Sequence, residues 1–214
     1  MQTIARNVRR SLAPLALGVA VALPFGASAA AEAITFDFKD PKGVNGVSFV
    51  LDSKLEPIVG FGGGIAGTVS YDPADPASIS GTITLSAEGL ATSNRRMTQV
   101  MRGAEWLGIS DHPIVTFAFK SAEVAESDVD GAVKLEVTGD LTLAGVTKEI
   151  SVPVMATYLA DMAKARGGAE AGDLLVLRST MMIDRTDFGI KPGMGGDVVA
   201  ETVVIEIPIA GYSK

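Results

Sequence analysis

The sequence predicts an all-β fold of antiparallel strands, and three features of the chain point to it. Through most of its length apolar and polar residues alternate, which is the period of a half-buried strand. Glycine, proline, aspartate and asparagine fall between the alternating segments, where turns are expected. The helices that a parallel sheet needs after each strand are missing from the pattern. The sequence therefore favours an antiparallel sandwich or barrel.

About nine segments carry this alternation. In the first, Ile34, Phe36 and Phe38 alternate with polar residues, and Ala144-Gly145 supplies a turn between two later segments. The segments lie at residues 34–39, 47–51, 65–71, 79–86, 115–119, 133–143, 146–154, 175–183 and 203–209. Closing about eight strands into a barrel removes the sheet edges that promote aggregation and leaves room for one ligand. The alternation alone does not separate a barrel from a sandwich.

One helix is expected over residues 94–106, because its apolar residues recur at helical spacing with arginines and a glutamine between them. Those apolar residues are Met97, Val100, Met101 and Ala104. Asn94, or one of the two residues before it, is a suitable N-cap. A second helical turn is expected around residues 158–166, where a glycine pair follows.

Residues 1–29 have the three parts of a cleavable signal peptide. Arginines precede an apolar run over residues 12–25, and Ala27-Ser28-Ala29 offers small residues to a signal peptidase. Cleavage is expected after Ala29, although sites up to Ala33 also satisfy the rule. The apolar run is shorter than the roughly 20 residues that span a bilayer, so a membrane anchor is disfavoured. The expected mature chain, residues 30–214, is long enough for one good core.

Charge and cysteine content narrow the possible partners and the sources of stability. Removal of the signal takes away three of the 18 basic residues and none of the 25 acidic ones, which leaves a charge of −10. Nucleic acids and anionic membranes are bound through basic surfaces, so both are disfavoured as partners. The chain has no cysteine, and a disulfide scaffold is therefore excluded. The sequence does not indicate an oligomeric state.

Two motifs invite a catalytic or nucleotide-binding interpretation that their surroundings do not favour. Gly62-x-Gly64-x-x-Gly67 matches a dinucleotide fingerprint by letter but runs into a strand and not a helix, so a bulged or bent strand is expected. His112 is the only histidine, and no partners for a zinc site or a catalytic triad are apparent. We expect His112 to be a turn residue before Pro113.

Two clusters of charged residues have both a functional and a structural interpretation. Asp72 and Asp75 are each followed by proline, which indicates a rigid turn more than a calcium loop. A second cluster, around the end of a strand, suits either a rim that grips a lipid headgroup or a set of structural ion pairs at a barrel end. Its members are Arg178, Asp184, Arg185 and Asp187.

Five stretches in order carry a resemblance to a known family. They are 67–73 (GTVSYDP), 92–107 with TSN at its start and MR and EWL towards its end, 112–121 with HP and TFAFKS, 139–148 (GDLTLAGVTK) and 185–190 (RTDFGI). Together these stretches resemble the YceI-like polyisoprenoid-binding proteins across nearly the whole mature chain. The chain departs from the family pattern at residues 40–46, which intervene between the first two strands.

The resemblance implies a lipocalin-like antiparallel barrel of eight strands, with one or two short helices, in the bacterial periplasm. It implies an apolar tunnel for a polyisoprenoid or similar long-chain amphiphile, with a role in transport, storage or stress response, or in handling isoprenoid quinones. The family has no agreed catalytic residues, so no enzyme activity, cofactor or metal is implied, and no stable membrane insertion is expected.

Aromatic, leucine and methionine residues of the apolar segments are the candidate tunnel lining, because flexible methionines suit an irregular chain. The candidates are Phe36, Phe49, Phe117, Phe119, Leu141, Leu143 and Met181, with Met97, Met101 and Trp106 of the helix near the opening. Arg178 and Arg185 are the candidate headgroup rim. Two alternatives stay open: an exported hydrolase that uses His112, and an acidic β-sandwich that binds protein partners.

Overall fold

The computed structural model describes residues 32–129 and 131–214. The predicted signal peptide, residues 1–29, lies outside the described residues. Within these two ranges, no helix of at least 18 residues has an apolar window suited to a bilayer.

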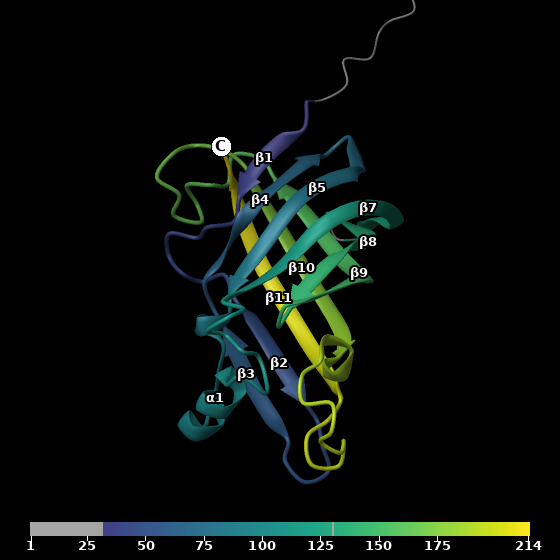
Figure 1. Ribbon diagram of the computed structural model, residues 1–214. Coiled ribbons are helices and arrows are strands. Elements are labelled where there is room, and N and C mark those ends of the chain that lie inside the picture. The colour runs from purple at the N-terminus through teal and green to yellow at the C-terminus, as the bar shows by residue number, and fades with distance from the viewer. Residues whose placement is uncertain (1–31, 130) are drawn as a thin grey trace, which may run out of the picture. The chain divides into compact units, whose positions relative to one another are not determined.

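Eight strands of the described chain form a closed antiparallel barrel (Figure 1). In ring order they are β1 (Ile34–Asp37), β4 (Ile65–Asp72), β5 (Asp75–Ser86), β7 (Ile114–Val129), β8 (Ala132–Leu143), β9 (Val146–Leu159), β10 (Leu174–Asp184) and β11 (Thr202–Ser213). The ring closes between β1 and β11, where Phe36 lies opposite Ser213 and Asp37 opposite Tyr212. Closure pairs the edges of the ring with each other, and this selects the barrel over the sandwich.

Three further strands extend the sheet from the N-terminal part of β11. The strand β2 (Val47–Leu51) pairs with β11 beyond the reach of β1, β3 (Ile58–Gly62) pairs with β2, and the short β6 (Ala91–Thr92) pairs with β3. β1 and β2 therefore pair with the same edge of β11, β1 near its C-terminal end and β2 near its N-terminal end. In the same way β3 runs into β4 through a bend at Gly63 and Gly64.

The glycine motif at residues 62–67 is this bend, as predicted for a bent strand. Gly64 has φ +79° and Gly67 has φ +120°, and residues with side chains rarely adopt these values. A Cβ at Gly67 would lie 2.1 Å from the carbonyl oxygen of Thr82 on β5. The motif lets two strands approach closely while one of them turns, and it continues as β4 rather than as a nucleotide-binding helix.

The predicted helix is confirmed in a shorter form. The helix α1 (Arg95–Arg102) begins at Asn94, whose Oδ1 accepts hydrogen bonds from the amides of Arg96 and Met97 at 2.9 and 3.1 Å. It ends at Gly103, so the four residues after Arg102 leave the helix. Two 3₁₀ turns accompany it, η1 (Ala87–Gly89) and η2 (Arg185–Phe188).

The second predicted helical turn is confirmed only as hydrogen-bonded turns, in which the amide of Arg166 donates to the carbonyl oxygen of Met162 at 3.2 Å. Tyr158 and Leu159 complete β9, and the residues that follow form hydrogen-bonded turns. Tyr158 donates a hydrogen bond from its hydroxyl to Asp173 at 2.9 Å, which ties the strand end to the segment before β10. The glycine pair at 167–168 ends these turns, and not a helix.

The inserted residues 40–46 form a loop that is pinned to the barrel. Asp40 Oδ2 accepts hydrogen bonds from the amide of Val44 at 3.0 Å and from Arg166 at 3.0 Å. Burial raises the pKa of the Asp40 carboxyl, but the backbone amides and the Arg166 guanidinium outweigh burial, so the pKa lies below its usual value. Asn45 is buried and bonds the backbone of Phe38 and of Ala210. The loop thereby ties the end of β1 to β11.

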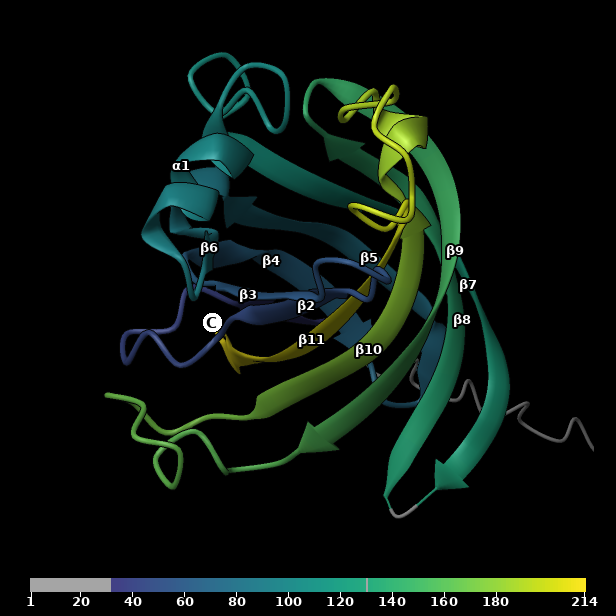
Figure 2. The ribbon, with the colours of Figure 1, turned by 90° about the horizontal axis from the view of Figure 1, so that it is seen from below.

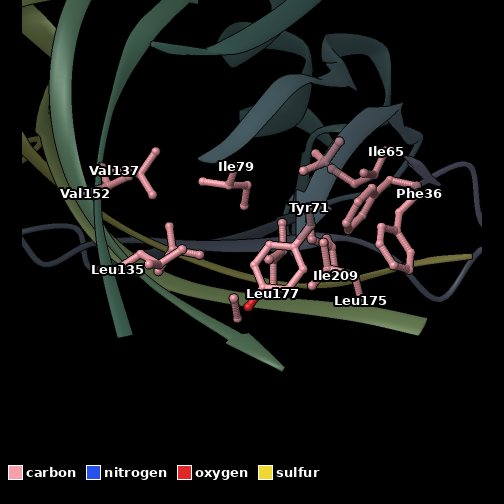
Figure 3. Close-up of a cluster of buried hydrophobic side chains, with 14 residues drawn as sticks. Phe36, Ile65, Tyr71, Ile79, Leu135, Val137, Val152, Leu175, Leu177 and Ile209 are labelled. Atoms are coloured by element: carbon pink, nitrogen blue, oxygen red, sulfur yellow. The ribbon is translucent and has the colours of Figure 1, made fainter. Parts of the chain in front are cut away.

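Two clusters of buried apolar side chains form the core of the barrel. One cluster gathers inward-facing side chains from the part of the barrel that β1 closes, and Figure 3 shows ten of its members by name. Phe36, Tyr71 and Leu175 of this cluster are at most 2% exposed. The other cluster gathers side chains from β2, β8, β10, β11, from η1 and the residue after it, and from η2 and the segment that follows it. The candidate site lies between the two.

Candidate functional site

An apolar cavity of about 630 Å³ occupies the part of the barrel that lies beside α1. Figure 2 views the molecule from that end, with β7, β8 and β9 curving around one side and α1 on the other. The volume falls within the range of roughly 300–1,000 Å³ that is typical of ligand pockets. Most of the lining side chains are apolar.

Strand alternation builds the wall of this cavity. On β10, Leu177, Ser179, Met181 and Ile183 line it, whereas the residues between them face outward. On the paired strand β11, every second residue from Val203 to Ile209 lines it as well. The period of two that was visible in the sequence is thus the physical origin of an apolar wall.

The first apolar cluster forms the floor of the cavity. Five of its members also line the cavity, and they are Ile65, Val152, Val154, Leu177 and Ile209. Others lie beyond the floor and do not reach the cavity, among them Phe36, Tyr71, Leu135 and Leu175 (Figure 3). These side chains are almost wholly buried, so this end of the barrel is filled.

The helix α1 and its flanking segments form the opposite, more polar side. Met97, Val100 and Met101 turn the apolar face of α1 to the cavity, and Val100 remains 50% exposed. Arg102 holds the helix in place by donating hydrogen bonds to the carbonyl oxygens of Glu88 and Leu90. Polar residues also line the cavity here, namely Glu56, Thr92, Asn94 and Arg96. The cavity lining is therefore polar beside α1 and apolar beyond it.

Nine of the ten predicted lining residues line the cavity. They are Phe49, Met97, Met101, Trp106, Phe117, Phe119, Leu141, Leu143 and Met181. The prediction for Phe36 is wrong in geometry, because Phe36 is fully buried opposite Val69 in the cluster beyond the floor. Its alternation identified the inward face correctly, but alternation does not tell how far along the barrel a residue lies.

Arg185 is a structural residue rather than a headgroup clamp. It is 2% exposed, and its guanidinium donates five hydrogen bonds of 2.6–3.1 Å to backbone carbonyl oxygens. The acceptors are Ile190, Lys191, Met194, Val199 and Ala200, all in the segment between η2 and β11. A guanidinium has five N–H groups, so none remains for a ligand. The guanidinium also lies over the Trp106 ring, 5.8 Å from its centroid.

The other members of the charged cluster also serve the fold. Arg178 is exposed on the outer face of β10 opposite Pro208 and does not line the cavity, which corrects its place in a rim. Asp184 caps η2 by accepting hydrogen bonds from the hydroxyl and amide of Thr186, and these bonds lower its pKa. Asp187 pairs with Lys148 of β9 at 3.6 Å.

The remaining candidates lie in turns away from the cavity lining. His112 is exposed immediately before Pro113, and its ring packs on Gly145 so closely that a Cβ there would lie 2.4 Å from Cε1. Asp72 accepts a hydrogen bond from the amide of Ala74 at 2.8 Å, as a rigid turn requires. Within the described ranges no group of three or more His, Asp or Glu residues is placed to hold a metal ion.

Sequence reasoning missed the polar residues of the lining. Among them Ser179 stands in the wall itself, between Leu177 and Met181. Its sequence could have indicated this role, because Ser179 is a polar residue at an inward position where its neighbours at positions 177, 181 and 183 are apolar. Arg96 and Glu56 carried no such signal, because their position beside the cavity depends on how α1 and the β2–β3 connection fold.

Comparisons of the sequence with known proteins agree on one family. The model of the YceI-like domain matches residues 31–210. A UPF0312 protein of Vibrio cholerae serotype O1 is 29% identical over 209 residues, which cover 97% of this chain and all of the relative. A UPF0312 protein of Ectopseudomonas mendocina is 30% identical over 148 residues, or 69% of this chain and 71% of the relative.

Solved structures share the fold. BcnA of Burkholderia cenocepacia superposes with a TM-score of 0.63 at 23% identity, over 78% of this chain and 95% of that one. A polyisoprenoid binding domain from Saccharophagus degradans superposes with a TM-score of 0.59 at 12% identity, over 85% of this chain and 99% of that one. At these identities the likeness establishes the closed barrel architecture.

Proposed function

We propose that this chain, which belongs to the YceI-like domain family, is a lipid-binding protein that holds the apolar chain of a polyisoprenoid or similar long amphiphile inside its barrel. The observation that carries the proposal is the apolar cavity of about 630 Å³ between the filled floor and α1. Moving a methylene group from water into such surroundings contributes about 0.8 kcal/mol, so a long chain is bound tightly with few polar contacts.

The arrangement of polar groups supports entry with the apolar end first. The floor consists of apolar side chains, whereas Arg96, Asn94 and Glu56 stand on the side beside α1. A charged or strongly hydrated headgroup is costly to bury without partners. We therefore place the hydrated end of an amphiphile beside α1 and its tail above the floor. The related Saccharophagus degradans structure is described as a polyisoprenoid binding domain, which supports this class of ligand.

A binding role without a cofactor fits the chemistry of the site better than catalysis. The lining holds no histidine, and His112 lies in a turn outside it. We propose export of the chain to the periplasm under the signal peptide predicted from the sequence, and a part in the transport or storage of lipid or in a stress response. A hydrolase that uses His112 would lose its activity in a His112→Ala variant without losing lipid binding.

Fluorescence titration tests the binding role. Trp106 is the only tryptophan and lines the cavity, so the conjugated fatty acid cis-parinaric acid should accept energy from it when bound. We expect saturable energy transfer and displacement by oleic acid. Octanoic acid, which offers ten fewer carbon atoms to the cavity, should displace the probe only at concentrations at least about a hundredfold higher. Absence of saturable transfer, or equal displacement by both acids, would count against the proposal.

A further inference from the structure

The cavity wall contains one buried hydroxyl that the protein leaves without a partner. Among residues 32–129 and 131–214, Ser179 Oγ is the buried side-chain oxygen or nitrogen atom that has no hydrogen-bond partner. It lines the cavity from β10, with Leu177 and Met181 as the inward neighbours on its own strand. On β11 the residue opposite is Ile207, which also lines the cavity.

Ser179 occupies a defined point in the barrel wall. The pairing of β10 with β9 ends at Arg178, opposite Met155, so Ser179 is the first residue of β10 beyond that pairing. The pairing of β10 with β11 continues along the whole strand. The hydroxyl therefore stands one inward position above the floor residue Leu177, deep in the cavity and away from the polar residues beside α1.

The other polar side chains of the lining already have partners in the protein or stand beside α1. Thr84 donates to the carbonyl oxygen of Ala66, and Thr92 is bonded to Asn94 and Thr98. Asn94 caps α1, and the donors of Arg185 are all engaged. Ser179 is thus the group in the apolar wall that is available to a ligand.

A buried hydroxyl without a partner is unfavourable, and native proteins almost always supply one. The side chains that flank Ser179 in the wall are apolar and offer its hydroxyl no partner. We propose that Ser179 hydrogen-bonds an oxygen atom of the bound lipid inside the barrel. The ligand class is then a long-chain compound with a hydroxyl, carbonyl or ether oxygen within its buried part, and not a bare hydrocarbon. This inference rests on the proposed function.

The test measures the binding of two ligands that differ by one oxygen atom. Each ligand is titrated against three forms of the protein. 12-Hydroxystearic acid and stearic acid, which differ by one hydroxyl in the middle of the chain, compete with diphenylhexatriene, a fluorescent hydrocarbon probe, for wild-type protein, Ser179→Ala and Ser179→Thr. We expect Ser179→Ala to weaken 12-hydroxystearic acid binding by about five- to tenfold and to leave stearic acid binding unchanged. Ser179→Thr keeps a hydroxyl and should retain most of the preference for the hydroxylated acid.

The outcomes separate this inference from the proposed function. If wild-type protein binds both ligands and Ser179→Ala weakens neither, or weakens both equally, the role of Ser179 is refuted while the lipid-binding role stands. If wild-type protein binds neither ligand and not the probe, the proposed function fails and the inference fails with it. Removal of the hydroxyl leaves the apolar surroundings intact, so we expect all three proteins to fold.

Discussion

Phe117→Asp should abolish lipid binding, with an affinity for cis-parinaric acid at least about a hundredfold below that of the wild-type protein. Phe117 lies in the cavity wall, in edge-to-face contact with Phe119 at 5.2 Å between ring centroids, and its ring covers Gly139. A carboxylate at this position would lie in apolar surroundings that do not solvate it, or would admit water where the lipid chain should lie. The measurement is the titration described for Trp106.

Met182→Asp is the matched control for this variant. Met182 lies on β10 next to the lining residue Met181, but it points outward and is 73% exposed. The same new charge on this outer face should leave lipid binding unchanged. Far-ultraviolet circular dichroism checks that both variants fold, and Phe117→Ser replaces Phe117→Asp should the latter not fold. Wild-type affinity in a folded Phe117 variant of either kind would remove this side chain from the binding wall.

Arg185→Met should lower the free energy of unfolding by about 3–5 kcal/mol, a large part of the roughly 5–15 kcal/mol typical of a domain. The side chain gathers five carbonyl oxygens of the segment between η2 and β11 around one buried guanidinium. Methionine keeps an unbranched apolar stem but has no donor, so buried acceptors lose their partners. Urea unfolding followed by circular dichroism measures the effect.

Two further variants sharpen the result for Arg185. Arg178→Met makes the same change on the outer face of β10, where the arginine is exposed, and should alter stability by no more than about 0.5 kcal/mol. Arg185→Lys keeps the charge but offers three donors in place of five, and we expect it to recover only part of the loss. Equal stability of Arg185→Met and Arg178→Met would contradict the structural role of Arg185.

The alternation of apolar and polar residues predicted most of the barrel strands. It failed for β3, where the inward residues are small and the large apolar residues point outward. Eight of the nine predicted segments lie wholly in strands, and the first, residues 34–39, runs two residues beyond the end of β1. The missed strand β3 has glycines at its inward positions 60 and 62 and the larger Val59 and Phe61 outside. Gly60 lies under the ring of Phe49, and a Cβ there would be 2.1 Å from that ring. The inward side chain of this position is thus supplied by the neighbouring strand, which no local pattern reveals.

The sequence predicted which side chains face the interior of the barrel, but not how far along the barrel each of them lies. Period-two alternation identifies which side chains face the interior, and so the wall residues Phe117 and Met181 followed from the sequence. The distinction between wall and floor depends on the tilt of the strands and on which side chains meet across the barrel. Phe36 therefore faces the interior as predicted but lies beyond the cavity floor. The sequence placed Arg185 near the end of a strand. Its five acceptors could not be predicted, because they lie in a segment that has no apolar periodicity.

Native mass spectrometry of the protein purified from the cell that makes it shows whether the barrel carries a lipid. Organic extraction and lipid analysis of the same sample identify the bound compound. We predict a stoichiometric mass addition that corresponds to one long-chain, oxygen-bearing isoprenoid or fatty compound. A protein that carries no lipid as isolated and takes up none when incubated with geranylgeraniol or oleic acid would contradict the claim.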